Sequence, residues 1–101
     1  MTVGEFSKYF IDNISRATVS NALKVTIKVN DTDYMFNDFI RGIITYIENC
    51  IKENRFTPEK CYGIIYLCNK ALKKFNSEIK YSKEYIVNDF IIDLWRLMNG
   101  D

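Results

Sequence analysis

The segment from Lys83 to Asn99 carries apolar residues around more of its circumference than one helical contact needs. At about 100° per residue, its apolar positions form one broad face: Ile86, Val87, Phe90, Ile91, Leu94, Leu97 and Met98. A second stripe runs beside this face at intervals of three and four residues: Tyr85, Asn88, Ile92 and Trp95. The broad face predicts burial within the fold. The second stripe predicts a further partner, which is either another part of this chain or another molecule.

Three other segments show the spacing of amphipathic helices, with apolar residues at intervals of three and four. They cover about residues 3–14, 39–52 and 58–76. Thr2 and Glu5 have the spacing of a capping box at the start of the first helix. Either Asn37 or Asp38 can cap the second. Thr57 before Pro58 is a strong start signal for the third.

Between the first and second helices, the sequence alternates with a period of two. Leu23, Val25, Ile27 and Val29 are separated by polar residues, a pattern typical of a strand with one solvent-exposed face. A turn at Asp31 and Thr32 would pair Val29 with Tyr34 and Ile27 with Phe36 on one face. We therefore predict a small, mainly helical α+β domain over residues 1–101. Its order is helix, β-hairpin, then three helices, with the hairpin packed on the helices.

Composition indicates a globular protein of the cytoplasm. The chain is 48% hydrophobic and 27% charged, which is ordinary for a soluble domain, and no apolar run approaches the roughly 20 residues that span a membrane. The amino terminus lacks the pattern of a signal peptide. Cys50, Cys61 and Cys68 fall at core-facing helical positions without CxxC spacing, which predicts free, buried thiols in a reducing compartment.

The sequence gives no sign of a catalytic site. The chain has no histidine, the residue most used as a general base and metal ligand near neutral pH, and no phosphate-binding or dinucleotide-binding glycine motif. Asp89 and Asp93 lie one helical turn apart, at positions expected to face water, where carboxylates make poor general acids. We predict a protein that is not an enzyme and has no metal, cofactor or small-molecule substrate.

Two surfaces could recognise a partner. Aromatic residues flanked by polar ones are typical of protein-binding hot spots. The stripe of Tyr85, Asn88, Ile92 and Trp95 is therefore the first candidate, for a protein partner or a second copy of the chain. The alternative for this stripe is that the fold itself covers it. The second candidate lies on the outer face of 58–76, where lysines could neutralise phosphates and tyrosines could stack on bases: Tyr62, Tyr66, Lys70 and Lys73.

These observations predict a small binding protein that acts through protein–protein contact. Such a protein would be an adaptor or an inhibitor encoded by a phage or mobile element, of the anti-CRISPR-like kind. Heavy use of Ile, Asn, Lys and Tyr is typical of the AT-rich genomes of low-GC bacteria and their phages. The alternative is an accessory protein that binds nucleic acid through the Tyr/Lys face, although a net charge of +1 gives no general attraction to a polyanion.

Overall fold

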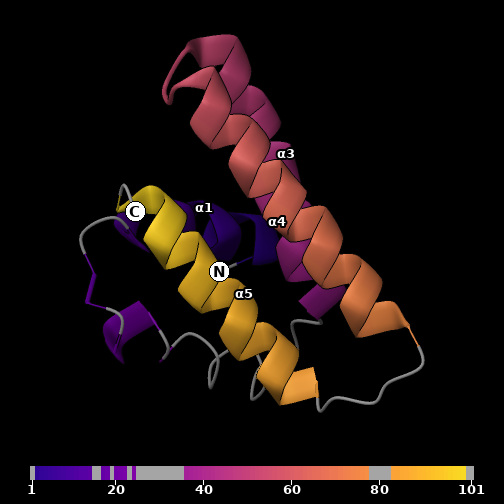
Figure 1. The fold of residues 1–101 in the computed structure, drawn as a ribbon. Coiled ribbons are helices and arrows are strands. Elements are labelled where there is room, and N and C mark those ends of the chain that lie inside the picture. The colour runs from indigo at the N-terminus through magenta and orange to yellow at the C-terminus, as the bar shows by residue number, and fades with distance from the viewer. Residues whose placement is uncertain are drawn as a thin grey trace.

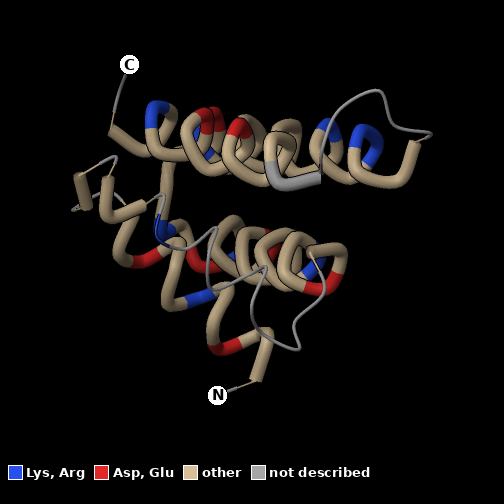
Figure 2. Tube along the Cα trace, turned by 90° about the horizontal axis from the view of Figure 1, so that it is seen from below, with Lys and Arg blue, Asp and Glu red and all other residues tan. Residues whose placement is uncertain are grey.

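A computed structural model of the 101-residue chain describes residues 2–14, 17, 18, 20–22, 24, 36–77 and 83–99. Its long helices are α1 (Val3–Ile14), α3 (Phe36–Glu53), α4 (Pro58–Asn76) and α5 (Lys83–Met98). Each packs against the next: α1 on α3, α3 on α4, and α4 on α5. Figure 1 shows α4 and α5 in front of α1 and α3, and Figure 2 shows the same two layers from below.

The predicted start signals of two helices are confirmed. The backbone N–H of Glu5 donates to Thr2 Oγ1 at 3.1 Å, and the backbone N–H of Thr2 donates to Glu5 Oε1 at 3.4 Å. This reciprocal pair satisfies two amides that a helix leaves without a partner. At the start of α4, Thr57 Oγ1 accepts from the backbone N–H of Lys60 at 3.3 Å, with Pro58 in the first turn. Both helices therefore begin where the sequence predicts.

The predicted α+β class and its β-hairpin are wrong. The described part of the chain contains no strand. The central hairpin positions, 25–35, lie outside the described residues, and the predicted positions on either side of them, Lys24 and Phe36, are both helical. Since α3 begins at Phe36, Asn37 and Asp38 lie inside this helix and neither caps it. A two-stranded hairpin has little stability of its own, whereas Phe36 gains a buried helical position.

An aromatic cluster explains that position. The ring centroid of Phe36 lies 4.6 Å from that of Phe75 and 5.9 Å from that of Phe90. These separations are typical of favourable aromatic pairs. The cluster draws on all four long helices: Phe6, Phe10, Phe36, Phe39, Phe75 and Phe90. The period of α3, which places Phe36 beside Phe39 on one face, thus prevails over the alternating pattern that precedes it.

Helices α1 and α3 approach each other closely at Gly42. A Cβ atom added to Gly42 would lie only 2.4 Å from Ser7 Oγ and 3.0 Å from Ser7 Cβ. The fully buried Ser7 hydroxyl lies 2.8 Å from the carbonyl oxygen of Val3 in α1 and 3.0 Å from that of Phe39 in α3, and it shares its single proton between the two acceptors. The buried hydroxyl is satisfied and also joins the two helices.

A tight turn connects α3 to α4. Asn54 has φ 54°, in the left-handed region that asparagine tolerates better than most residues. The backbone N–H of Asn54 donates to Ile51 O at 3.3 Å, and that of Arg55 donates to Cys50 O at 3.0 Å. This pair of bonds forms the Schellman motif that ends many helices, and it fixes the position of Arg55.

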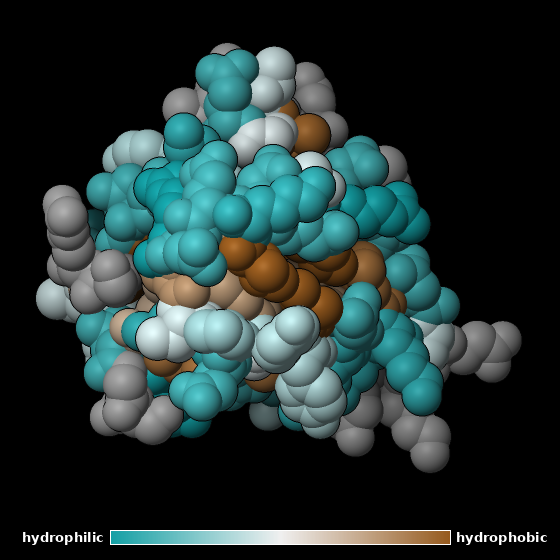
Figure 3. Space-filling model, turned by 90° about the horizontal axis from the view of Figure 1, so that it is seen from above, coloured by the Kyte–Doolittle hydropathy of each residue, from teal (hydrophilic) through white to brown (hydrophobic). Residues whose placement is uncertain are grey.

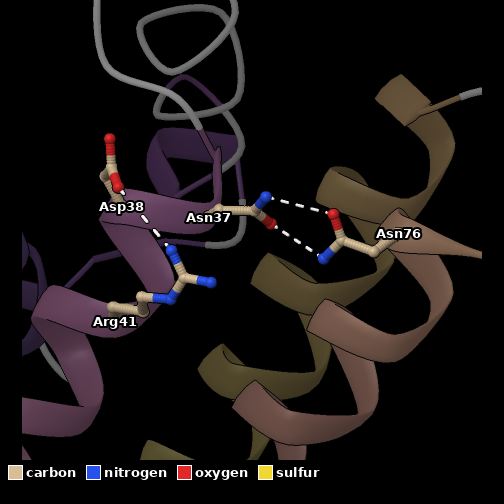
Figure 4. Close-up of polar contacts among 4 residues, drawn as sticks. All are labelled: Asn37, Asp38, Arg41 and Asn76. Atoms are coloured by element: carbon tan, nitrogen blue, oxygen red, sulfur yellow. Dashed lines mark hydrogen bonds and ion pairs between the residues drawn. The ribbon is translucent and has the colours of Figure 1, made fainter.

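A pair of asparagines joins the opposite ends of the same two helices (Figure 4). Asn37 Nδ2 donates to Asn76 Oδ1 at 3.1 Å, and Asn76 Nδ2 donates to Asn37 Oδ1 at 3.0 Å. Asn76 also donates to Leu72 O at 2.8 Å. Asp38 and Arg41 form an exposed ion pair nearby, of a kind that contributes little to stability.

The margin of the core reaches the surface. Figure 3 shows a band of hydrophobic side chains between hydrophilic ones on the face seen from above. Leu97, which the sequence places on the broad apolar face of the last helix, is half-buried rather than buried, and so are Ile44 and Ile51 of α3. The helix faces are therefore predicted correctly, but the edge of each face is partly exposed.

Candidate functional site

A groove runs along the contact between α4 and α5. One part has a volume of about 320 Å³ and is lined from both helices. A shallower part adjoins it and shares Leu67, Lys70 and Asp93 with the first. The two helices come close beside this second part because Gly63 has no side chain: an added Cβ would lie 3.0 Å from Leu97 Cδ2. The groove is the boundary of a close helix pair.

Charges of opposite sign line the two walls of the groove. Lys70 and Lys74 come from α4, and Asp89 and Asp93 come from α5, which also contributes Arg96 to the shallower part. Each pair is spaced by four residues, so its two members lie on one face of their helix. Among the described residues, no ion pair within 4.0 Å joins these lysines to these aspartates. Figure 2 shows both signs of charge on the layer formed by α4 and α5.

Exposed tyrosines flank the same groove. Tyr62, Tyr66 and Tyr85 have 63%, 64% and 57% of their surface accessible. Tyr66 lines the shallower part of the groove, and Tyr85 lines the first part. Tyr62 lies one turn before Tyr66 on α4, and a fourth exposed tyrosine, Tyr9, lies in the other layer on α1. We call the surface formed by the groove and its flanking residues the α4–α5 face: Tyr62, Tyr66, Lys70, Lys74, Tyr85, Asp89 and Asp93.

The structure divides the stripe predicted on the last helix. Tyr85 is exposed and belongs to the groove, whereas Asn88, Ile92 and Trp95 are half-buried. Trp95 packs against the core, and its indole Nε1–H donates to Ala17 O at 2.7 Å. The only polar atom of the indole ring therefore has its hydrogen-bond partner within this chain. Part of the stripe thus serves the fold itself, as the sequence allows.

The second predicted surface is entirely exposed. Tyr62, Tyr66, Lys70 and Lys73 all lie on the solvent side of α4. Tyr66 and Lys70 line the groove, where they meet Asp93 of α5. The structure therefore brings half of the predicted nucleic-acid surface together with Tyr85 of the predicted protein-binding stripe, and it adds carboxylates to both.

Sequence analysis missed a polar cluster in the other layer. Tyr46 of α3 donates a hydrogen bond to Asp12 Oδ1 of α1, and Arg55 Nη2 lies 3.8 Å from the same carboxylate oxygen. The guanidinium carbon of Arg55 also lies 5.5 Å from the centroid of the Tyr46 ring. Burial, followed by the hydrogen bond to Asp12, raises the pKa of the Tyr46 phenol above its ordinary value. The cluster joins α1 to the end of α3, and no local sequence pattern predicts it.

The prediction that the three cysteines are buried is confirmed. Burial raises the pKa of the Cys68 thiol to about 12, and it also raises the pKa values of Cys50 and Cys61. A thiol with a raised pKa holds little of the thiolate form that attacks substrates or binds metals. These residues therefore behave as small apolar side chains of the core.

Several other features of the described residues bear on function. They include no group of three or more His, Cys, Asp or Glu side chains placed to hold a metal ion. Within the same ranges, every helix is too short or too polar to cross a lipid bilayer. No protein-family model, curated protein or solved structure matches this chain.

Proposed function

We propose that this chain is a non-enzymatic binding protein that acts through protein–protein contact on the α4–α5 face. The observation that carries the proposal is the grouping of three exposed tyrosines around a groove with lysines on one wall and aspartates on the other. Tyrosine offers a large contact area with few rotatable bonds and a polar tip, and it is enriched in protein interfaces. An adaptor or an inhibitor of the anti-CRISPR-like kind would use such a surface to occupy part of its target.

The mixed charge of the groove favours a protein partner over a polyanion. Lys70 and Lys74 attract phosphate groups, but Asp89 and Asp93 on the facing wall repel them. A protein surface can present charges of both signs and so complement both walls. The charge pattern would then determine which partner is accepted and in which orientation, while Tyr66 and Tyr85 supply most of the contact area.

The proposal is tested by comparing variants that differ only in which exposed tyrosine is removed. Wild-type protein, the Tyr66→Ala/Tyr85→Ala variant and Tyr9→Ala would be used as bait in extracts of the native cells, and affinities would be measured with the purified partner. Tyr9 is a matched control because it is 58% exposed and lies on α1. The double variant should lose affinity by roughly tenfold or more, as expected for hot-spot residues, and Tyr9→Ala should bind normally. Equal binding by all three proteins would contradict the proposal.

A nucleic-acid function is the second candidate, because Tyr62, Tyr66, Lys70 and Lys73 are all exposed on α4. It predicts binding to a single-stranded oligonucleotide that weakens steeply between about 50 and 200 mM salt. Fluorescence anisotropy with wild type and a Lys70→Glu/Lys73→Glu variant measures this directly. Steep salt dependence that disappears in the variant would favour the nucleic-acid function, whereas the protein-binding proposal predicts no measurable affinity.

A further inference from the structure

We infer that the α4–α5 face binds a second copy of this chain, related by a two-fold axis that runs along the groove. The inference rests on the proposed function, because it names the partner of the same face. In a symmetric dimer of this kind, one surface patch meets an identical patch. The patch must therefore complement itself in both charge and shape.

The charges of the groove meet this requirement. A patch with charges of one sign would repel its own copy, since like charges brought together in an interface are strongly unfavourable. Here two lysines on α4 balance two aspartates on α5, and no ion pair between them within the described chain uses up these charges. The first part of the groove is therefore divided into a basic wall and an acidic wall, and Arg96 of α5 adds a positive charge in the shallower part.

The positions of these charges along the two helices also suit a symmetric dimer. Figure 1 shows α5 returning along α4 in nearly the opposite direction, and Lys70 and Asp93 line both parts of the groove. Lys74 lies one turn farther along α4, and Asp89 lies one turn earlier on α5. Because the helices run in opposite directions, Lys74 is on the level of Asp89, just as Lys70 is on the level of Asp93.

This register selects one orientation of the two-fold axis. Rotation about an axis parallel to the helices keeps each residue at its own level and places α4 of one copy over α5 of the other. Lys70 then faces Asp93 of the second copy, and Lys74 faces Asp89 of the second copy. An axis across the helices would place α4 on α4 and bring lysines together. Opposite charges meet only in the first arrangement, in which the four helices form a bundle.

The required contact area indicates how much of the face takes part. A stable, specific interface buries roughly 800 Å² from each partner, about an eighth of the 6432 Å² accessible surface of this chain. Contact confined to the four charges would be too small, so the dimer must extend along both helices and include Tyr66 and Tyr85. Exposed tyrosines flanking a groove with an apolar floor, formed in part by Leu67 and Phe90, provide this additional area.

The test is sedimentation equilibrium of the full chain from about 10 to 500 μM. Wild type should form a dimer whose affinity falls as salt rises from about 0.05 to 0.5 M. Lys70→Asp/Lys74→Asp makes both walls of the first part of the groove acidic, and Asp89→Lys/Asp93→Lys makes both walls basic, so each variant alone should dimerise roughly tenfold more weakly or not at all. An equimolar mixture of the two should restore a dimer. A Lys8→Asp/Lys52→Asp variant changes net charge as much as the acidic variant does, but on α1 and α3, and should dimerise like wild type.

The outcomes separate this inference from the proposed function. A wild-type protein that stays monomeric, while its binding of a different protein depends on Tyr66 and Tyr85, overturns the dimer and leaves the function standing. A dimer that neither charge reversal weakens must use another surface, which contradicts the inference. Circular dichroism of each variant checks that it is folded. Recovery on mixing requires folded partners and so excludes misfolding as the cause of dissociation.

Discussion

Substituting alanine for Gly42 should destabilise the protein, although alanine normally strengthens a helix. In the interior of an exposed helix, Gly→Ala contributes about 1 kcal/mol of stability. Here the added Cβ would lie 2.4 Å from Ser7 Oγ, so the helices must separate or Ser7 must move. Overpacking of this kind costs about 1–3 kcal/mol, and loss of the buried hydroxyl's hydrogen bonds costs about 1–3 kcal/mol more. The net loss should be about 1–5 kcal/mol, which lowers the midpoint of thermal unfolding by about 4–8 °C for each kcal/mol in a chain of this size.

Thermal and urea unfolding of Gly42→Ala and Gly4→Ala provide the assay and its control. Gly4 is exposed near the start of α1, and the nearest atom to an added Cβ, Thr2 Oγ1, is 3.9 Å away. Gly4→Ala should therefore be neutral or stabilising. A Ser7→Gly/Gly42→Ala variant removes the hydroxymethyl group of α1 that the new methyl group of α3 would strike, and it should recover part of the loss, a coupling typical of residues in contact. If Gly42→Ala were as stable as Gly4→Ala, the close contact of α1 with α3 would be refuted.

Three further predictions concern other contacts. Trp95→Phe removes the hydrogen bond to Ala17 O and should lower the free energy of unfolding by about 1 kcal/mol; an unchanged urea midpoint would contradict this use of the indole. Tyr46→Phe removes the donor to Asp12 and should cost about 1–2 kcal/mol, whereas Tyr62→Phe, at an exposed position, should cost nothing measurable. Burial raises the pKa of Cys68 to about 12, so the unfolded chain loses this thiol proton first. Stability should therefore fall as pH rises above about 8.5, the ordinary pKa of a cysteine, and the urea midpoint of wild type should fall more steeply there than that of Cys68→Ala.

Helix positions could be predicted where spacing and capping agreed. The start of α1 combines an apolar period with the Thr2–Glu5 pair, and the start of α4 combines one with Thr57 and Pro58; both begin as expected. The hairpin prediction failed because an alternating pattern records only which residues are apolar. It gave no sign that Phe36 would pack with phenylalanines of α4 and α5, since those contacts join residues 39 and 54 positions apart.

The candidate surface was predictable only in part, for a similar reason. The exposure of Tyr62, Tyr66, Lys70 and Lys73 follows from the period of α4 and was expected. Sequence spacing within one helix cannot show that Tyr85 lies across a groove from Lys74, because that depends on how α4 and α5 pack. From the sequence alone, Asp89 and Asp93 were expected only to face water. The packing of α4 against α5 shows that lysines lie on the opposite wall of the groove.

The α4–α5 face is tested most directly by mapping contacts residue by residue. Amide chemical shifts of the ¹⁵N-labelled protein would be followed as its concentration is raised or as a captured partner is added. Changes should concentrate along the groove, around Tyr66 and Lys70 on α4 and around Tyr85 and Asp93 on α5, and should be small around Tyr9 on α1. Changes confined to the outer surfaces of α1 and α3 would contradict the assignment of this face.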